Sequence, residues 1–154
     1  MAAATIADAP HLLLVEAPYY AHIAALLREG AEKALASAGA TFDVIQVPGS
    51  FELPGAIGMA ARAGKYDGFV ALGCVIRGET THYDHICEST ADWLQHLAVT
   101  DGLAIGYGIL TCENEQQALH RANPGGNGRD HGGAAVRACL AMVGVKRRFA
   151  GQPG

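Results

Sequence analysis

The sequence has few charged and few aromatic residues and no long apolar segment. Of its 154 residues, 17% are charged and 6% are aromatic, and 11 Lys and Arg face 15 Asp and Glu, which gives a net charge of −4. This mild negative charge provides no electrostatic reason to expect nucleic acid or an anionic membrane as a partner. The longest run without a polar side chain, Gly68–Ile76, is about nine residues, whereas a membrane-spanning helix needs about 20.

Signals of disulfides, targeting and disorder are also missing. The four cysteines form no CxxC pair, so we expect free and mostly buried thiols. Met1–Pro10 lacks the basic start and apolar stretch of a signal peptide. We therefore expect a cytoplasmic protein with a flexible N-terminal segment over residues 1–10. Half of the residues are apolar and no linker or repeat interrupts the chain, so residues 11–154 are predicted to form a single domain.

Short apolar runs alternate with helical patterns along the chain. Strands are expected at His11–Glu16, Thr41–Val47, Asp67–Val75 and Leu103–Leu110, helices at Tyr20–Ala38, Leu53–Ala63, Thr81–Thr100, Glu113–Ala122 and Ala134–Arg148, and a loop at Asn123–Gly133. This alternation predicts an α/β fold with a parallel sheet covered on both faces. Right-handed crossovers then require one reversal of strand order, which predicts a flavodoxin-like three-layer sandwich with order 2-1-3-4. In such sheets ligands bind outside the carboxyl ends of the strands.

The segment Ile76–His85 (IRGETTHYDH) holds the densest set of polar residues. Gly78 permits a tight turn, and Thr80 and Thr81 stand where a helix N-cap is expected. Backbone N–H groups at a helix start bind anions, so either a substrate phosphate or simple capping accounts for this loop. Neither the phosphate-binding pattern GxxxxGK[ST] nor GxGxxG is present.

His82 falls in the first turn of the helix expected after this loop. The positive end of the helix dipole should lower its pKa, so a neutral imidazole could transfer a proton at neutral pH. The alternative is a surface histidine without a role. A metal site made of His82 and His85 with Asp84 or Cys87 is a weaker alternative, because zinc needs three or four ligands and no further ligand is placed nearby.

The other strand ends carry further candidates. Ser50 and Glu52, in the stretch PGSFELP, can hydrogen-bond a polyhydroxyl ligand, or they can form an N-cap with an acidic first turn. Tyr19 and Tyr107 each lie near the end of a strand region, where an aromatic ring stacks on a flat heterocycle or simply packs. Arg121 either reaches a phosphate or is a solvated arginine.

Three blocks of the sequence together resemble one family. They are VPGSFELP at Val47–Pro54, LGCVIRGETTHYDHICE at Leu72–Glu88 and GILTCENEQQALHRA at Gly108–Ala122. From about His11 to Phe149 the chain resembles the 6,7-dimethyl-8-ribityllumazine synthases. The resemblance implies the penultimate step of riboflavin biosynthesis, in which 5-amino-6-(D-ribitylamino)uracil and 3,4-dihydroxy-2-butanone 4-phosphate condense to 6,7-dimethyl-8-ribityllumazine, phosphate and water. It also implies a flavodoxin-like fold, no metal or organic cofactor, and pentamers with active sites between neighbouring subunits.

The resemblance also implies roles for particular residues. His82 matches the proton-transfer residue, and the phosphate-binding positions match Glu79, Thr80 and Arg121. The residues matching those that bind the pyrimidine and its ribityl chain are Tyr19, Ser50, Phe51, Glu52, Cys74, Val75, Ile76 and Tyr107. Of these, Tyr107 matches an aromatic residue that the adjacent subunit contributes in many members.

The stretch after Arg121 departs from the pattern of shell-forming members. It reads NPGGNGRDHGG, so Arg129 or His131 would have to replace their usual lysine. We therefore expect a pentamer or a decamer rather than a 60-subunit shell, and riboflavin synthase is a candidate partner. The alternatives are a non-catalytic relative that binds flavin or lumazine, another flavodoxin-like binder of small molecules, and a structural oligomer with a vestigial crevice.

Overall fold

A computed structural model of the chain describes residues 9–78, 82–125 and 129–151, without the side chain of residue 82. The expected flexible segment therefore lies mostly outside the described residues. In chain order the elements are β1 (His11–Glu16), α1 (Ala21–Ala38), β2 (Thr41–Gln46), the 3-10 helix η2 (Ser50–Glu52), α2 (Leu53–Arg62), β3 (Gly68–Ile76), α3 (His82–Asp101), β4 (Ile105–Cys112), α4 (Glu115–Ala122) and α5 (His131–Phe149).

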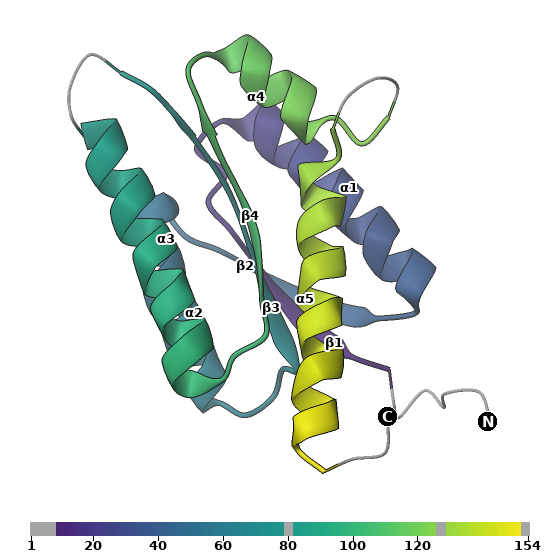
Figure 1. Ribbon diagram of the computed structural model, residues 1–154. Helices are drawn as coiled ribbons and strands as arrows, with labels where there is room; N and C mark the ends of the chain where they lie inside the picture. Colours follow the sequence, from purple (N-terminus) through teal and green to yellow (C-terminus); the bar gives the residue numbers. More distant parts are fainter. Residues whose placement is uncertain (1–8, 79–81, 126–128, 152–154) are drawn as a thin grey trace.

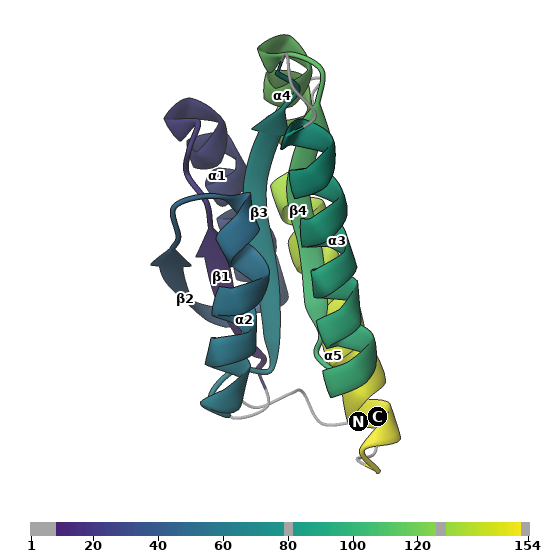
Figure 2. The ribbon, with the colours of Figure 1, turned by 90° about the vertical axis from the view of Figure 1, so that its left-hand side faces the viewer.

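The four strands form one parallel sheet in the order β2-β1-β3-β4, which confirms the predicted order and the flavodoxin-like sandwich. Figure 1 shows α2 and α3 on one face of the sheet and α1 and α5 on the other. The view turned by 90° shows the same arrangement, with α2 and α3 in front of the strands (Figure 2). No helix in the described part of the chain is long and apolar enough to cross a membrane.

Two apolar layers hold the sheet between its helices. Successive side chains of β1 point to opposite faces. Leu12 and Leu14 are fully buried in the cluster that includes residues of α1 and α5. Leu13 and Val15 are buried in the cluster that includes residues of α2 and α3. Because β1 lies inside the sheet with both faces covered, its four central residues are all apolar, and each such buried side chain contributes about 1.5–3 kcal/mol.

The start of α5 differs from the sequence-based expectation. The helix begins at His131 rather than Ala134, so the loop predicted to run to Gly133 is wrong at that end. Asp130 is the N-cap, and its Oδ1 accepts a hydrogen bond from the backbone N–H of Gly133 at 2.9 Å. A Cβ at Gly132 would overlap the carbonyl oxygen of Leu27 in α1. Gly132, one of the glycines that suggested a loop, therefore allows the close approach of two helices.

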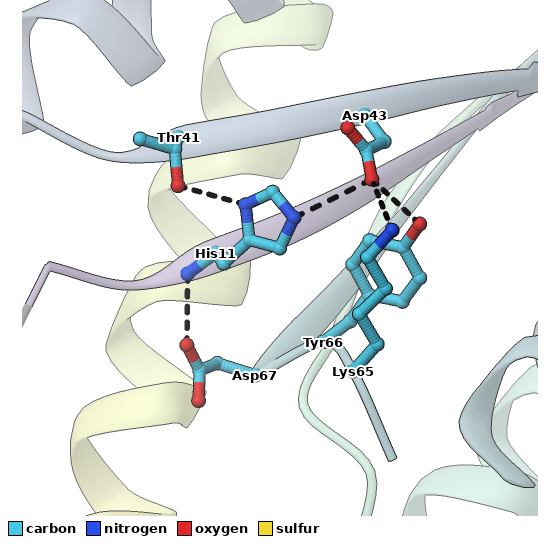
Figure 3. Close-up of polar contacts among 6 residues, drawn as sticks. All are labelled: His11, Thr41, Asp43, Lys65, Tyr66 and Asp67. Atoms are coloured by element: carbon cyan, nitrogen blue, oxygen red, sulfur yellow. Dashed lines mark hydrogen bonds and ion pairs between the residues drawn. The ribbon is translucent and has the colours of Figure 1, made fainter. Parts of the chain in front are cut away.

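A polar network ties the amino ends of β1 and β2 to the segment before β3 (Figure 3). The ring of His11 bonds Thr41 Oγ1 through Nδ1 at 2.7 Å and lies 3.4 Å from Asp43 Oδ2 through Nε2. Tyr66 donates to the same Asp43 oxygen at 2.8 Å, and this hydrogen bond lowers the pKa of the carboxyl. The backbone N–H of His11 donates to Asp67 at 2.8 Å. This network lies at the opposite end of the sheet from the residues that the sequence predicts to bind substrate.

Candidate functional site

The predicted site lies where the strands end. Glu16, the last residue of β1, pairs with Leu72 of β3, whereas β3 and β4 continue to the pair Ile76 and Cys112. Strands β3 and β4 therefore extend beyond the carboxyl end of β1. The segments that leave β1 and β2 lie beside the exposed ends of β3 and β4, which is the usual place for a ligand in such a sheet.

Two aromatic rings are exposed to solvent beside the ends of the shorter strands, β1 and β2. Tyr19 follows β1, and its side chain is 75% exposed, with an edge-to-face contact to Tyr20 at 5.0 Å between ring centroids. Phe51 follows β2 and is 63% exposed. Single exposed apolar side chains are common in folded chains, and Trp93 and Phe149 are likewise exposed. The rings of Tyr19 and Phe51 are available to stack on a flat heterocycle.

Ser50 is not the helix cap that one reading of the sequence proposed. The 3-10 helix η2 precedes α2, which begins at Leu53, and the side chain of Ser50 makes no cap hydrogen bond. Ser50 is buried, and its Oγ would lie 2.9 Å from a Cβ at Gly73. Gly73 thus lets the serine approach the backbone of β3. Glu52, at the end of η2, is half-buried.

The end of β3 contributes Cys74, Val75 and Ile76. Cys74 is buried, and this burial raises the pKa of its thiol to about 12. It is therefore a neutral lining group rather than a nucleophile at physiological pH. Val75 and Ile76 are half-buried. A small pocket of about 10 Å³, with room for about one water, lies next to Cys74, and its lining residues are Glu16, Ala17, Tyr20, Ala24, Leu27, Leu72, Gly73 and Cys74.

The structure anchors Arg121 at the end of β4. Asn114 caps α4 by accepting a hydrogen bond from the backbone N–H of Gln117 at 2.9 Å. From this helix, Nη1 of Arg121 donates to the carbonyl oxygen of Thr111 at 3.3 Å and to Cys112 Sγ at 3.4 Å. The guanidinium is half-buried and fixed, which does not fit the alternative of a freely solvated arginine.

Glu16 is a buried carboxylate that the sequence reasoning missed. It is 4% exposed, and its Oε1 accepts hydrogen bonds from Arg28 Nη1 at 3.0 Å and from Gln46 Nε2 at 2.7 Å. These bonds join the ends of β1 and β2 to α1. They fix the points from which the chain segments carrying Tyr19 and Ser50 depart. The only sequence signal was an acidic residue at the end of an apolar strand.

Arg77 was also missed by the sequence reasoning. Its Nε lies 3.0 Å from Glu113 Oε2, its Nη2 lies 3.4 Å from Asp84, and its guanidinium lies over the ring of Tyr83 at 4.4 Å. The ion pair with Glu113 raises the pKa of Arg77, so the guanidinium stays charged. A sequence signal existed, because Arg77 and Glu113 each come directly after a strand.

The residues with the central predicted roles fall in the part of the chain that is not described. Helix α3 begins at His82, which confirms that this histidine lies in the first turn. Its side chain, together with Glu79, Thr80 and Thr81, lies outside the described residues. Their roles in proton transfer, phosphate binding and capping stay predictions, as does a metal site that includes His82. Among the described side chains, no group of three His, Cys, Asp or Glu could hold a metal ion.

Tyr107 does not lie with the other predicted residues, so its placement near a strand end is wrong. It is the third residue of β4, opposite Ala71 of β3. Its side chain is 44% exposed at the open edge of the sheet. There it borders an open groove of about 430 Å³, which is lined by Ala91, Asp92, Leu94, Gln95, Ala98, Ile105 and Tyr107. Within one chain, this ring and the carboxyl-end residues do not form a common site.

Comparison with known proteins identifies the family. The family model of 6,7-dimethyl-8-ribityllumazine synthase matches residues 9–147. A 6,7-dimethyl-8-ribityllumazine synthase of Agrobacterium fabrum is 50% identical over 147 residues, which cover 92% of this chain and 98% of that protein. 6,7-Dimethyl-8-ribityllumazine synthase 1 of Rhizobium meliloti is 48% identical over 144 residues, covering 90% and 93%. The chain thus belongs to the 6,7-dimethyl-8-ribityllumazine synthase family.

Proposed function

We propose that the carboxyl-end site of this chain is where the family's reaction takes place. The chain is a transferase of riboflavin biosynthesis, and it condenses 5-amino-6-(D-ribitylamino)uracil with 3,4-dihydroxy-2-butanone 4-phosphate to give 6,7-dimethyl-8-ribityllumazine, phosphate and water. The observation that carries the assignment of the site is that the exposed rings of Tyr19 and Phe51 and the anchored guanidinium of Arg121 all lie at the carboxyl end of the sheet.

The pyrimidine substrate binds on the β1 and β2 side of this site. Tyr19 and Phe51 stack on or cover the flat ring, while Ser50 and Glu52 hydrogen-bond the ribityl hydroxyls and ring. Cys74, Val75 and Ile76 line the pyrimidine from β3. Cys74 is buried and the apolar Val75 and Ile76 are half-buried, which supports this role, because a site that excludes water strengthens the hydrogen bonds made inside it.

The phosphate substrate binds between the start of α3 and the guanidinium of Arg121. Backbone N–H groups at Glu79 and Thr80 hold the phosphate, and Arg121 supplies the opposite charge. In the described part of the chain no carboxylate forms an ion pair with Arg121. Its partners are a carbonyl and a thiol, so its positive charge stays available for an anion.

The reaction needs proton transfers and close positioning of two substrates. An amine of the pyrimidine attacks the ketone, phosphate departs, and the ring closes with loss of water. Holding both substrates at one site supplies much of the rate acceleration. His82 takes and returns protons in these steps, which adds about 10²- to 10⁴-fold. Its place at the positive end of α3 favours the neutral imidazole needed to accept a proton.

The working enzyme is a homopentamer, or a decamer of two pentamers, in which a neighbouring subunit completes each site. Two observations support this proposal. At the carboxyl ends, the rings of Tyr19 and Phe51 are left 75% and 63% exposed by the described part of the chain. Tyr107, the aromatic residue expected from a neighbouring subunit, is exposed beside the groove at the sheet edge.

The compartment and the further partners are also proposals. All four cysteines are free, which suits the reducing cytoplasm. We expect no cofactor in the reaction, and riboflavin synthase is the candidate partner that would receive the product.

A spectroscopic assay tests the proposed function directly. Purified protein is mixed with both substrates, and absorbance of the lumazine product is followed against the spontaneous reaction. Product formation well above background supports the assignment. A folded oligomer that binds lumazine or flavin without accelerating the reaction would instead identify a non-catalytic binding protein.

A further inference from the structure

Glu16 and Gln46 form a polar link between the carboxyl ends of β1 and β2. They are the last residues of these two strands, and they pair with each other in the register of the sheet. Oε1 of Glu16 accepts a hydrogen bond from Gln46 Nε2 at 2.7 Å and another from Arg28 Nη1 of α1 at 3.0 Å. Because Glu16 is only 4% exposed, its carboxylate depends on these two partners rather than on water.

The residues proposed to bind the ring and the ribityl chain lie on the two segments that leave this link. Tyr19 comes shortly after Glu16, and the segment Ser50–Glu52 comes shortly after Gln46. The rings of Tyr19 and Phe51 are both exposed. The spacing between these two rings therefore depends on how the ends of β1 and β2 are held together.

The two segments also meet beside the same residue of β3. A Cβ at Gly73 would lie 2.9 Å from Ser50 Oγ and 3.8 Å from the Cβ of Ala17. Ala17 and Ser50 are both buried. The backbone N–H of Ala17 donates to the carbonyl oxygen of Leu72 at 2.9 Å. One chain thus brings the start of each segment to a common place at the carboxyl end of the sheet.

The burial of Glu16 separates its role from that of a substrate ligand. Glu52 is half-buried on the segment after β2, where a ligand can reach its carboxylate. Glu16 is closed to solvent, and the groups that it holds are the side chain of Gln46 and the guanidinium of Arg28. It can therefore influence a bound ligand only through the placement of the two segments.

We propose that Glu16 is a positioning residue for the pyrimidine side of the site, where its buried carboxylate fixes the spacing between Tyr19 and the segment Ser50–Glu52. This inference rests on the proposed function for the identity of the substrate. Small displacements of the groups around a substrate reduce its binding or turnover even when no direct contact is removed.

Four variants test this role: Glu16→Met, Glu16→Gln, Gln46→Ala and the control Glu32→Gln. Glu16→Met removes both hydrogen bonds at similar side-chain length, whereas Glu16→Gln keeps an oxygen that can accept from Gln46. Gln46→Ala removes the link and leaves the pair of Glu16 with Arg28 in place. Glu32 is a matched control, because its Oε1 also accepts a hydrogen bond from Arg28, at 2.9 Å, but its side chain is 44% exposed on α1.

The measurements use two ligands that separate the two sides of the site. The lumazine product carries the ring and the ribityl chain without a phosphate, and inorganic phosphate represents the other substrate. The Kd of each ligand for the assembled protein is compared with the KM for each substrate and with the free energy of unfolding.

A positioning role predicts weaker binding on the pyrimidine side alone. Glu16→Met and Gln46→Ala each raise the Kd of the lumazine product and the KM for the pyrimidine by about fivefold, an effect of the size that residues without ligand contact exert through packed neighbours. The Kd of phosphate and the KM for the butanone phosphate stay unchanged. Glu16→Gln falls between wild type and Glu16→Met, and Glu32→Gln changes none of the four values. The double variant Glu16→Met with Gln46→Ala is no weaker than Glu16→Met, because both substitutions break the same link.

Three results would overturn the inference. An unchanged lumazine Kd in Glu16→Met and Gln46→Ala would show that the link does not set the site, and Gln46→Ala decides this alone if Glu16→Met does not fold. An equal loss in Glu32→Gln would place the effect in α1 rather than in the link. Equal losses of lumazine and phosphate binding would indicate a general structural defect. A wild type that forms product while the variants bind lumazine normally refutes this inference alone, whereas a wild type that forms no product refutes the proposed function.

Discussion

The surroundings of Arg121 differ from those of the three arginines that form ion pairs in the described part of the chain. Arg28, Arg77 and Arg147 each face a carboxylate, whereas Arg121 is held by a backbone carbonyl and a thiol. Its geometry is therefore fixed without neutralisation of its charge. Such an arrangement suits the binding of a phosphate that arrives with the substrate.

Replacing Arg121 by alanine should raise the KM for the butanone phosphate selectively. Loss of a charge-assisted hydrogen bond of about 1.5–3 kcal/mol corresponds to a change of about ten- to a hundredfold. The KM for the pyrimidine should change little. Steady-state kinetics with each substrate varied in turn provides the measurement. An equal rise in both KM values would argue against a phosphate-binding role.

Individual residues could be predicted from the sequence only in part. Tyr19 and Phe51 are exposed, and their roles in ligand binding stay predictions. Tyr107 was misplaced because strand ends cannot be located closely in a run that is apolar throughout. The roles of Glu16 and Arg77 depend on partners far away in the sequence, and no local pattern indicates such contacts.

At the scale of elements, glycine has two different roles within α5. Gly132 lies at the helix start, where a Cβ would overlap the carbonyl oxygen of Leu27 in α1. Gly144 lies further along the same helix, and a Cβ there would meet nothing within 4 Å. The first glycine is needed for packing, while the second lowers helix stability without a packing role.

The substitutions Gly132→Ala and Gly144→Ala should therefore have opposite effects on stability. Gly132→Ala should destabilise the fold by roughly 1–3 kcal/mol, because a helix backbone would have to move. Gly144→Ala should leave stability unchanged or raise it by up to about 1 kcal/mol. Chemical denaturation of both variants checks this. Equal effects of the two substitutions would show that the contact between α1 and α5 is looser than described.

Element types could be predicted from the sequence more fully than element ends. The apolar runs predicted the strands, because a parallel strand that is covered on both faces needs apolar residues at nearly every position. The start of α5 was missed because HGG reads as a turn when its packing partner is unknown. The tertiary contact with Leu27 explains Gly132, and the N-cap side chain of Asp130 occupies the space beside Gly133.

At the scale of the molecule, the β4 edge of the sheet is open within one chain. β4 is the outer strand of the sheet on this side, and the groove beside it is bordered by Tyr107 and the half-buried Ala98. The strand order was predictable from chain connectivity and crossover handedness. The partner that covers this edge could not be predicted from residue patterns. Apolar residues that contact a second copy of the chain look the same in a sequence as apolar residues that pack in the core.

Ala98→Glu should disrupt the assembly if this groove is a subunit interface. The substitution keeps helix propensity high and places a charge in the groove, where burial without a partner is unfavourable. Ala141→Glu, on an exposed position of α5, is the matched control. Light scattering should give five or ten times the chain mass of 16.0 kDa for wild type and control, and a smaller particle for Ala98→Glu. A wild-type particle near sixty chains, or an intact Ala98→Glu oligomer, would contradict this proposal.

The most direct test of the central claim compares His82→Ala with wild type in the absorbance assay for the lumazine product. The account predicts rapid product formation by the wild type. It predicts slower turnover by the variant, by up to the about 10²- to 10⁴-fold that proton transfer contributes, with an unchanged fold and assembly. Equal rates for the two proteins would contradict the role of His82, and a wild-type rate no faster than the spontaneous reaction would contradict the assignment of the carboxyl-end site as a synthase active site.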